Sequence, residues 1–180
     1  MSKKAFFLDR DGVVIRQVHY LHKPEDVVLE STVPEALKYI HSKGALAIVI
    51  TNQSGVARGM FTLDDVHAVH RRITELLAPY GEKIDGFYIC PHHPDYTGPC
   101  SCRKPEPGLF LAAEKEMDVD LANSFMAGDK YSDLESGISA GLKQSVLLTT
   151  GYGQKYIQKA RENNYPVADT LLEAVRQLLG

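Results

Sequence analysis

The sequence predicts an α/β fold, in the form of a Rossmann-like, doubly wound and mostly parallel sheet with helices on both faces. Short apolar runs alternate with amphipathic segments along the whole chain. The run Ala45–Ile50 is apolar at every position, which is typical of a strand buried on both faces of a parallel sheet. No internal repeat, low-complexity tract or linker-like stretch interrupts this pattern, so we expect residues 1–180 to form one domain.

The first half of the chain is predicted to hold three strands and two helices. Thr32 and Glu35 have the spacing of a capping box, and Gly44 stops the helix that follows them. Thr62 can cap a second, longer helix. The apolar stripes of the two helices are Val33, Leu37 and Ile40, and then Val66, Val69, Ile73, Leu76 and Leu77. The predicted strands cover residues 5–8, 45–50 and 87–90.

The second half begins with a loop rich in Pro and Gly that runs through Pro107. After it the pattern returns to alternation, with a short helix closed by Gly141 and a last helix that starts at a Thr170-x-x-Glu173 capping box. The predicted helices cover residues 109–117, 132–140 and 170–179, and the predicted strands cover 124–127 and 146–148.

Composition and charge exclude several classes of protein. Apolar residues make up 44% of the chain and charged residues 24%, which is typical of a globular domain and not of a disordered chain. The net charge of −3 provides no overall field that would attract nucleic acid. No apolar run approaches the roughly 18 residues of a membrane span, and the start of the chain leads at once into a strand. We therefore expect a cytoplasmic protein without a signal peptide.

Several charged and polar side chains follow the predicted strands, where ligands bind in open α/β sheets. Asp9 and Asp11 follow the first strand, Thr51 the second and Asp129 the fourth, and Lys104 lies in the loop between the third and fourth strands. Taken singly, each is compatible with a turn, a helix cap or a solvated charge. Three carboxylates placed together, however, repel one another unless a cation shares the site, and Mg²⁺ is the obvious candidate. With Lys104 and the Thr51 hydroxyl, such a site suits a phosphoryl group.

The order DxDG, TN, RKP and GDxxxD resembles the haloacid-dehalogenase-type (HAD) phosphatases over nearly the whole chain. The resemblance implies a HAD-like fold in which Asp9 is the nucleophile that forms an aspartyl-phosphate and Asp11 is the acid–base residue. It also implies that Thr51 and Lys104 contact the phosphoryl oxygens. Mg²⁺ would be held by Asp9, Asp129 and the backbone carbonyl of Asp11. Many members have Thr where Val13 stands here. Asp133 either orients Lys104 or a metal-bound water, or is a favourably placed acid in the first turn of a helix.

All three cysteines lie in one window with two histidines, in the order Cys90-x-His92-His93 and Cys100-x-Cys102. Clustered Cys and His in a chain without other cysteines favour a tetrahedral, structural zinc site over a disulfide scaffold. The family resemblance favours His92 over His93 as the fourth ligand, beside Cys90, Cys100 and Cys102. Because Arg103 and Lys104 follow at once, zinc would fix both cations against the phosphate.

The zinc loop narrows the resemblance to the branch that contains the heptose-bisphosphate and histidinol-phosphate phosphatases. The stretch from Thr51 to Gly59, Cys90-Pro91-His92-His93-Pro94 and Thr150-Gly151 resemble the heptose enzymes, which implies removal of the 7-phosphate of a heptose 1,7-bisphosphate in nucleotide-heptose biosynthesis. A histidinol phosphatase or another sugar-phosphate phosphatase is the alternative. A remote alternative is an inactive zinc-loop binding module. The expected substrate-binding residues are Gln17, Val18, His19, Tyr20, Asn52, Gln53, Ser54, Gly55, Val56, Arg58, Arg103 and Lys130.

The segments between these motifs hold one clear helix each, so we expect no separate cap domain and a shallow site closed by loops. Since no basic stripe interleaved with aromatic residues is present, we expect no nucleic-acid partner. A monomer without a membrane partner is predicted.

Overall fold

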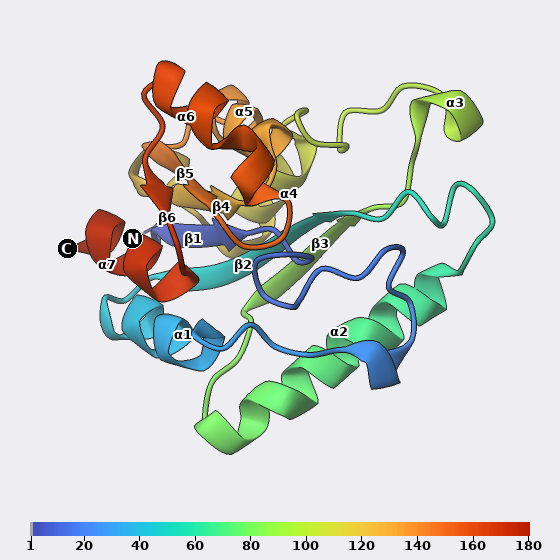
Figure 1. The fold of residues 1–180 in the computed structure, drawn as a ribbon, viewed down its shortest axis with the longest axis horizontal. Helices are drawn as coiled ribbons and strands as arrows, with labels where there is room; N and C mark the ends of the chain where they lie inside the picture. The colour runs from blue at the N-terminus through green and yellow to red at the C-terminus, as the bar shows by residue number, and fades with distance from the viewer. Residues whose placement is uncertain (1) are drawn as a thin grey trace.

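The computed structural model describes residues 2–180 and contains one six-stranded parallel sheet. The strands lie in the order β3-β2-β1-β4-β5-β6, so the chain starts in the middle, winds to one edge and then returns to build the other half. This confirms the predicted doubly wound α/β fold (Figure 1). The strands are β1 (Ala5–Leu8), β2 (Leu46–Asn52), β3 (Gly86–Cys90), β4 (Phe125–Gly128), β5 (Gln144–Leu148) and β6 (Val167–Ala168).

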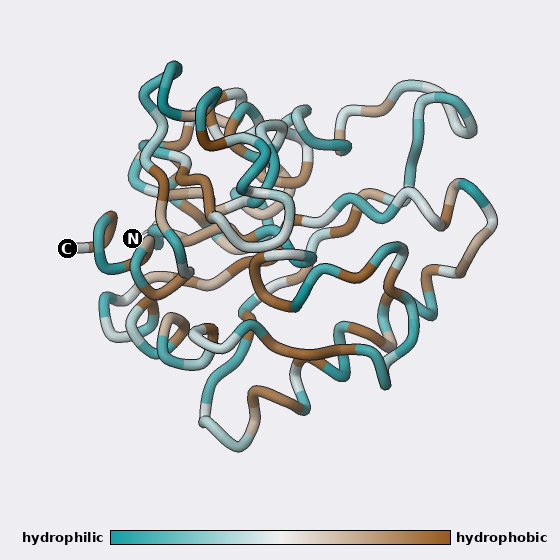
Figure 2. Tube along the Cα trace, in the orientation of Figure 1, coloured by the Kyte–Doolittle hydropathy of each residue, from teal (hydrophilic) through white to brown (hydrophobic). Residues whose placement is uncertain are grey.

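Helices cover both faces of the sheet because successive strand residues point to opposite sides. Phe6 and Leu8 pack into a core with α1 (Val33–Ser42), α2 (Leu63–Leu77) and α7 (Leu171–Leu179). Ala5 and Phe7 face the other side, where Phe7 meets Phe110 of α4 (Gly108–Met117) edge to face at 4.9 Å. On that side α5 (Tyr131–Ser139) and α6 (Ile157–Glu162) complete the layer, as Figure 1 shows, and the apolar segments lie along the strands in Figure 2.

Most predicted elements are present with shifted ends, and some short ones were not predicted. The sequence patterns did not indicate β6, α6 or the four-residue helix α3 (Pro94–Thr97). Thr32 stands at the N-cap position of α1, but the capping box that its spacing from Glu35 predicts does not form, because the Thr32 side chain makes no capping hydrogen bond. The helix begins instead with Pro34 in its first turn, and Glu35 pairs with Arg176 of α7 at 2.9 Å. The predicted cap of α2 is confirmed, since Thr62 accepts from the Asp65 backbone.

The carboxyl ends of β1, β2 and β4 meet at one edge, because these strands are direct neighbours and all parallel. Thr51 and Asn52 are the last two residues of β2 rather than the residues after it. Among the described residues no helix has both the length and the apolar character needed to cross a membrane.

Candidate active site

Three buried carboxylates meet at this edge of the sheet. Asp9 follows β1, Asp129 follows β4 and Asp133 lies in the first turn of α5; each offers an oxygen within 4.8 Å of the other two. All three side chains are buried, with residue exposures of 4% or less. Gly12 and Gly151 press against Asp129 so closely that neither position has room for a Cβ atom. The two glycines therefore fix the turns around the cluster.

The electrostatics of the cluster suit a bound cation. Burial, together with the charges of Asp9 and Asp133, raises the pKa of Asp129 to about 8. Its Oδ1 atom is buried and has no hydrogen-bond partner within residues 2–180. An unpartnered carboxylate oxygen beside two further carboxylates is an oxygen-ligand set that a hard divalent cation would neutralise. The residues present thus fit the Mg²⁺ that the sequence predicts.

Lys104 reaches the cluster from the loop that contains Cys90, His92, Cys100 and Cys102, called the Cys–His loop below. Its ammonium donates to Asp9 Oδ1 at 2.8 Å and to the Ile50 carbonyl at 2.9 Å, and it pairs with Asp133 at 2.8 Å. Burial alone would lower the pKa of Lys104, but the two carboxylates raise it well above its usual value. Lys104 is therefore a fixed positive charge beside the predicted nucleophile.

Asp9 is held as a carboxylate with one oxygen occupied. Burial would raise the pKa of Asp9, but the charges of Lys104 and Lys130 and two hydrogen bonds lower it. Its Oδ1 accepts from Lys104 and, at 2.9 Å, from the Arg10 backbone. Within the described chain its Oδ2 accepts no hydrogen bond, which leaves an oxygen free to attack.

Asn52 connects the end of β2 to the loop that carries Lys104. Its side-chain amide donates to the Lys104 carbonyl at 3.2 Å and accepts from the Lys104 backbone N–H at 3.0 Å. Asn52 was predicted to bind substrate, and it also positions the backbone of Lys104. The Thr51 hydroxyl, next to it, is fully buried and accepts from Gln53 at 2.8 Å.

Asp11 lies beside the cluster in a different environment. The Arg10 guanidinium donates two hydrogen bonds of 3.0 Å to the Asp11 carboxylate, and the Gln53 amide donates to the same carboxylate at 3.1 Å. Such a bidentate pair fixes the orientation of a carboxylate. Arg10 thus contacts both carboxylates, Asp9 through its backbone N–H and Asp11 through its guanidinium, and their other partners differ.

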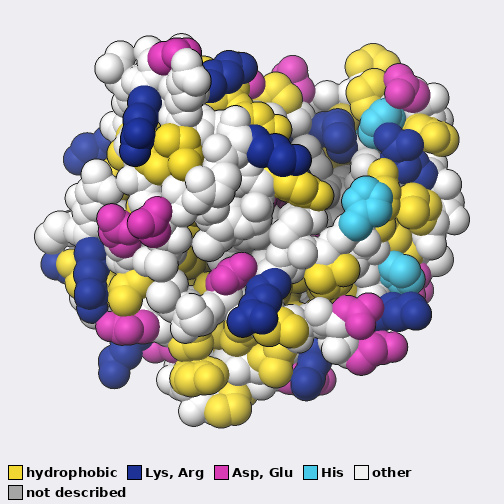
Figure 3. Space-filling model, viewed as in Figure 1, with side chains coloured by type: hydrophobic (Ala, Val, Ile, Leu, Met, Phe, Trp, Pro, Cys, Tyr) yellow, Lys and Arg dark blue, Asp and Glu magenta, His cyan; other side chains and the backbone are white. Residues whose placement is uncertain are grey.

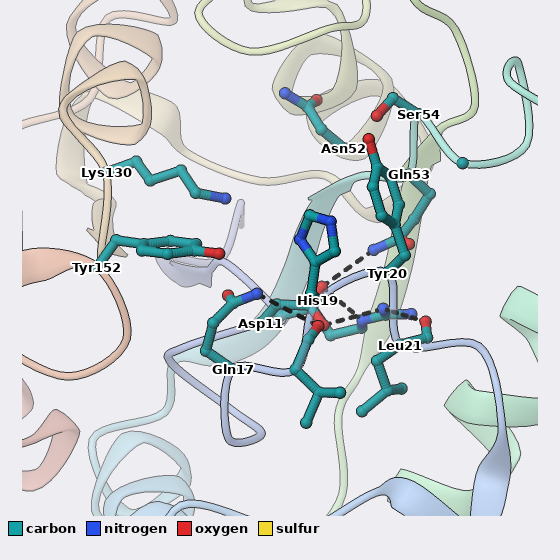
Figure 4. Close-up of a pocket in the computed structure, with 13 residues that line it drawn as sticks. Asp11, Gln17, His19, Tyr20, Leu21, Asn52, Gln53, Ser54, Lys130 and Tyr152 are labelled. Carbon is teal, nitrogen blue, oxygen red and sulfur yellow. Dashed lines mark hydrogen bonds and ion pairs between the residues drawn. The ribbon is translucent and has the colours of Figure 1, made fainter.

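A pocket opens next to Asp11, and Figure 4 shows the residues that line it. It contains nine of the twelve predicted substrate-binding residues: Gln17, Val18, His19, Tyr20, Asn52, Gln53, Ser54, Gly55 and Lys130. Val56, Arg58 and Arg103 are not among the residues that line it. The lining also includes Arg10, Asp11 and Leu21, and it includes Tyr152, which sequence reasoning missed. Its position just after β5, at the ligand-binding edge, was the available signal.

The two arginines outside the pocket are engaged by the Cys–His loop. Arg58 lies over the Tyr96 ring at 5.0 Å and contacts His93 Nε2 at 3.1 Å. Arg103 donates to the His92 carbonyl at 3.3 Å. In this state both side chains connect loops around the pocket and do not line its wall.

The three cysteines come together as the spacing predicts. The Sγ atoms of Cys90 and Cys102 lie 2.8 Å apart, and Cys100 Sγ lies 3.8 Å and 3.6 Å from them. A group of three thiols with mutual distances below 4.8 Å suits a tetrahedral metal site with one further ligand. The structure does not bring a His92 ring nitrogen within the same limit of all three thiols.

Comparisons with known proteins agree with this geometry. The HAD-hydrolase-like family matches residues 101–174. The D-glycero-beta-D-manno-heptose-1,7-bisphosphate 7-phosphatase of Haemophilus ducreyi is 41% identical over 160 residues, which is 84% of this chain and 86% of the relative. The corresponding protein of Pasteurella multocida is 38% identical and covers 98% of this chain and 95% of its own.

A solved structure extends the similarity to the whole fold. It is the D,D-heptose 1,7-bisphosphate phosphatase of B. bronchiseptica, crystallised with magnesium and phosphate. It is 32% identical to this chain, has a TM-score of 0.88 and covers 98% of both chains.

Proposed function

The chain belongs to the family of D-glycero-D-manno-heptose-1,7-bisphosphate 7-phosphatases, and from this premise we propose that it removes the 7-phosphate of that sugar through an aspartyl-phosphate on Asp9. The observation that carries the proposal is the buried arrangement of Asp9, Lys104 and Asp129 beside a pocket built from the predicted substrate residues. The chain is a phosphatase, that is, a hydrolase of phosphoric monoesters.

In the first step, Asp9 Oδ2 attacks phosphorus, and the bond from phosphorus to the sugar oxygen breaks. Asp11 gives its proton to that oxygen, which leaves as the free hydroxyl. The charge of Lys104, 2.8 Å from Asp9, and the Thr51 hydroxyl stabilise the phosphoryl oxygens. A carboxylate needs such help because it otherwise repels a phosphate dianion.

In the second step, Asp11 takes a proton from water, which attacks the phosphorus of the aspartyl-phosphate. Inorganic phosphate leaves, and the carboxylate of Asp9 is restored. Asp9, Asp129 and the Asp11 backbone carbonyl would hold Mg²⁺, which screens the negative charge of the phosphate. The bidentate contact with Arg10 is made by the ionised form of Asp11, and it orients the carboxylate that takes the proton from water in this step.

Cys90, Cys100 and Cys102 would bind structural zinc with His92 as fourth ligand, which would hold the loop that presents Lys104. Val56, Arg58 and Arg103 would reach substrate if the loops close over the pocket. A cytoplasmic, monomeric enzyme with no nucleic-acid or membrane partner remains our prediction.

The test is Mg²⁺-dependent phosphate release from two substrates. We expect kcat/KM for heptose 1,7-bisphosphate to exceed that for histidinol phosphate by a few hundredfold, which is about 3.5 kcal/mol of transition-state discrimination. A ratio near one, or a reversal, would contradict the proposed substrate. If wild-type protein with added Mg²⁺ releases phosphate from neither substrate, the proposed reaction is contradicted.

A further inference from the structure

Tyr152 lines the pocket but belongs neither to the catalytic motifs nor to the predicted substrate-binding residues. It lies in the loop after β5, between Gly151 and Gly153, and its backbone N–H donates to Asp129 Oδ2 at 2.8 Å. Neither flanking glycine has room for a Cβ atom, because Asp129 and the Leu148 carbonyl approach too closely. Thr150 adds a 2.6 Å hydrogen bond to the Gly12 carbonyl. The loop is therefore fixed against the catalytic turns.

The Lys130 side chain packs over the ring of Tyr152. Lys130 Nζ lies 5.3 Å from the ring centroid. Figure 4 shows Lys130 alongside the ring, with the Lys130 amine and the Tyr152 hydroxyl both directed toward the pocket. Lys155 Nζ lies 4.8 Å from the same centroid. Both distances are within the range of cation–π attraction.

Lys130 has a strong competing attraction. It follows Asp129 directly in the chain, beside the buried cluster of Asp9, Asp129 and Asp133. Even so, its ammonium forms no ion pair or side-chain hydrogen bond in the described part of the chain, whereas Lys104 forms ion pairs with Asp9 and Asp133. The Tyr152 ring is therefore the contact that accompanies the position of Lys130 over the pocket, away from the carboxylates that would bind the metal.

We propose that Tyr152 is a positioning residue for Lys130: its ring holds the ammonium over the pocket, where it binds the second, non-reacting phosphate of a bisphosphate substrate. This inference rests on the proposed function and deepens it. It assigns selectivity for a doubly anionic substrate to a pair of residues on two neighbouring strand ends, β4 and β5. It also keeps one cation away from the metal site.

The test compares two substrates in three variants. One substrate is heptose 1,7-bisphosphate, and the other is p-nitrophenyl phosphate, which lacks a second phosphate. For Tyr152→Leu we expect the ratio of the two kcat/KM values to fall about tenfold, that is by ~1.4 kcal/mol, mainly through KM for the bisphosphate. Tyr152→Phe keeps the ring and should keep the ratio within about twofold. Tyr39→Leu, which removes a tyrosine under Lys43 on α1, is the matched control and should not change the ratio.

A double-mutant cycle separates positioning from simple packing. In a Lys130→Met background, Tyr152→Leu should have no further effect on the ratio. An undiminished effect there would overturn the proposal, as would an equal fall for both substrates, which would show a structural role. If Tyr152→Phe loses as much as Tyr152→Leu, the hydroxyl and not the ring is responsible, and the proposal is wrong. Failure of the proposed function would appear separately, as wild-type protein with no preference for the bisphosphate.

Discussion

At the scale of single residues, Asp133 shows how one side chain can serve two purposes. The sequence left two interpretations open: a residue that orients Lys104 or a metal-bound water, or an acid in the first turn of a helix. Asp133 Oδ1 pairs with Lys104 at 2.8 Å, and Oδ2 accepts from the Lys130 backbone at 3.1 Å at the start of α5. The contact with Lys104 and the place in the first turn of α5 thus occur together, because the helix begins directly beside the carboxylate cluster.

Asp133→Asn separates these two contributions. The amide oxygen can still accept from the Lys130 backbone, but Lys104 loses one of its two anionic partners. Because a hydrogen bond to a charged group is worth roughly 1.5–3 kcal/mol, we expect kcat to fall by about ten- to a hundredfold with a smaller change in KM. Steady-state kinetics measure this effect, and Asp133→Ala, which also removes the cap, should lower Tm further. A kcat within twofold of wild type would contradict this role.

At the scale of elements, long and strongly patterned segments were predictable and short ones were not. The apolar residues of α2 recur on one face over fifteen residues, so its sequence alone indicates a helix. Strand β6 has two residues and α6 six, which is too short for either period to be recognised. The failed cap of α1 has another cause. The Thr32 backbone is helical (φ −95°, ψ 0°), whereas a capping residue is extended. Glu35 instead pairs with Arg176, 141 positions away, a partner that only tertiary packing provides.

The candidate site follows the same division. Asp9, Thr51 and Asp129 were predictable because parallel strands bring their carboxyl ends to one edge. The engagement of Arg58 by Tyr96 and His93 depends on how two loops pack, so no pattern in the sequence indicates it.

The Cys–His loop gives a prediction at this scale. His93 already contacts Arg58 through Nε2 at 3.1 Å and the Asp95 backbone through Nδ1 at 3.2 Å. We therefore expect His92→Gln to lose most bound zinc and His93→Gln to retain about one zinc per chain, measured by elemental analysis after dialysis. Cys100→Ser should behave like His92→Gln and should lower kcat by disordering the loop that presents Lys104. Zinc retained in His92→Gln but lost in His93→Gln would reverse the assignment, and a metal-free, fully active wild type would contradict the site.

At the scale of the whole molecule, the fold places buried negative charge at one edge and mixes charges elsewhere. Basic and acidic side chains are interspersed over the face drawn in Figure 3, in keeping with the net charge of −3. The two helical layers bury the strands, and the proposed catalytic residues occupy the edge where the chain reverses direction around β1 and β4. Folding therefore concentrates the carboxylates that a cation must offset.

This concentration predicts a coupling between pH, Mg²⁺ and stability. The pKa of Asp129 is about 8 in the folded chain, against an ordinary value of 3.8, so the folded state binds more protons between these pH values. This group's contribution to the stability of the metal-free protein is present below its ordinary pKa and is lost as pH rises toward about 8. We expect the increase in Tm on adding Mg²⁺ to be larger at pH 8 than at pH 6, since Mg²⁺ replaces the proton.

Differential scanning fluorimetry in EDTA and in Mg²⁺ at both pH values measures this difference. Asp129→Asn is the control, and its Tm should respond weakly to Mg²⁺ at either pH. An equal Mg²⁺ effect at pH 6 and pH 8 in the wild type would contradict the assignment of Asp129.

The central claim is that Asp9 becomes phosphorylated, and trapping the intermediate tests it most directly. Enzyme turning over heptose 1,7-bisphosphate with Mg²⁺ is quenched in acid and treated with borohydride, which reduces an acyl phosphate to the alcohol and so converts the aspartate to homoserine. We predict homoserine at position 9 by peptide mass spectrometry, and none in Asp9→Asn, which should also lack turnover while keeping the Tm of a folded protein. Turnover by wild-type enzyme without modification at position 9, or with modification at another carboxylate, would contradict the account.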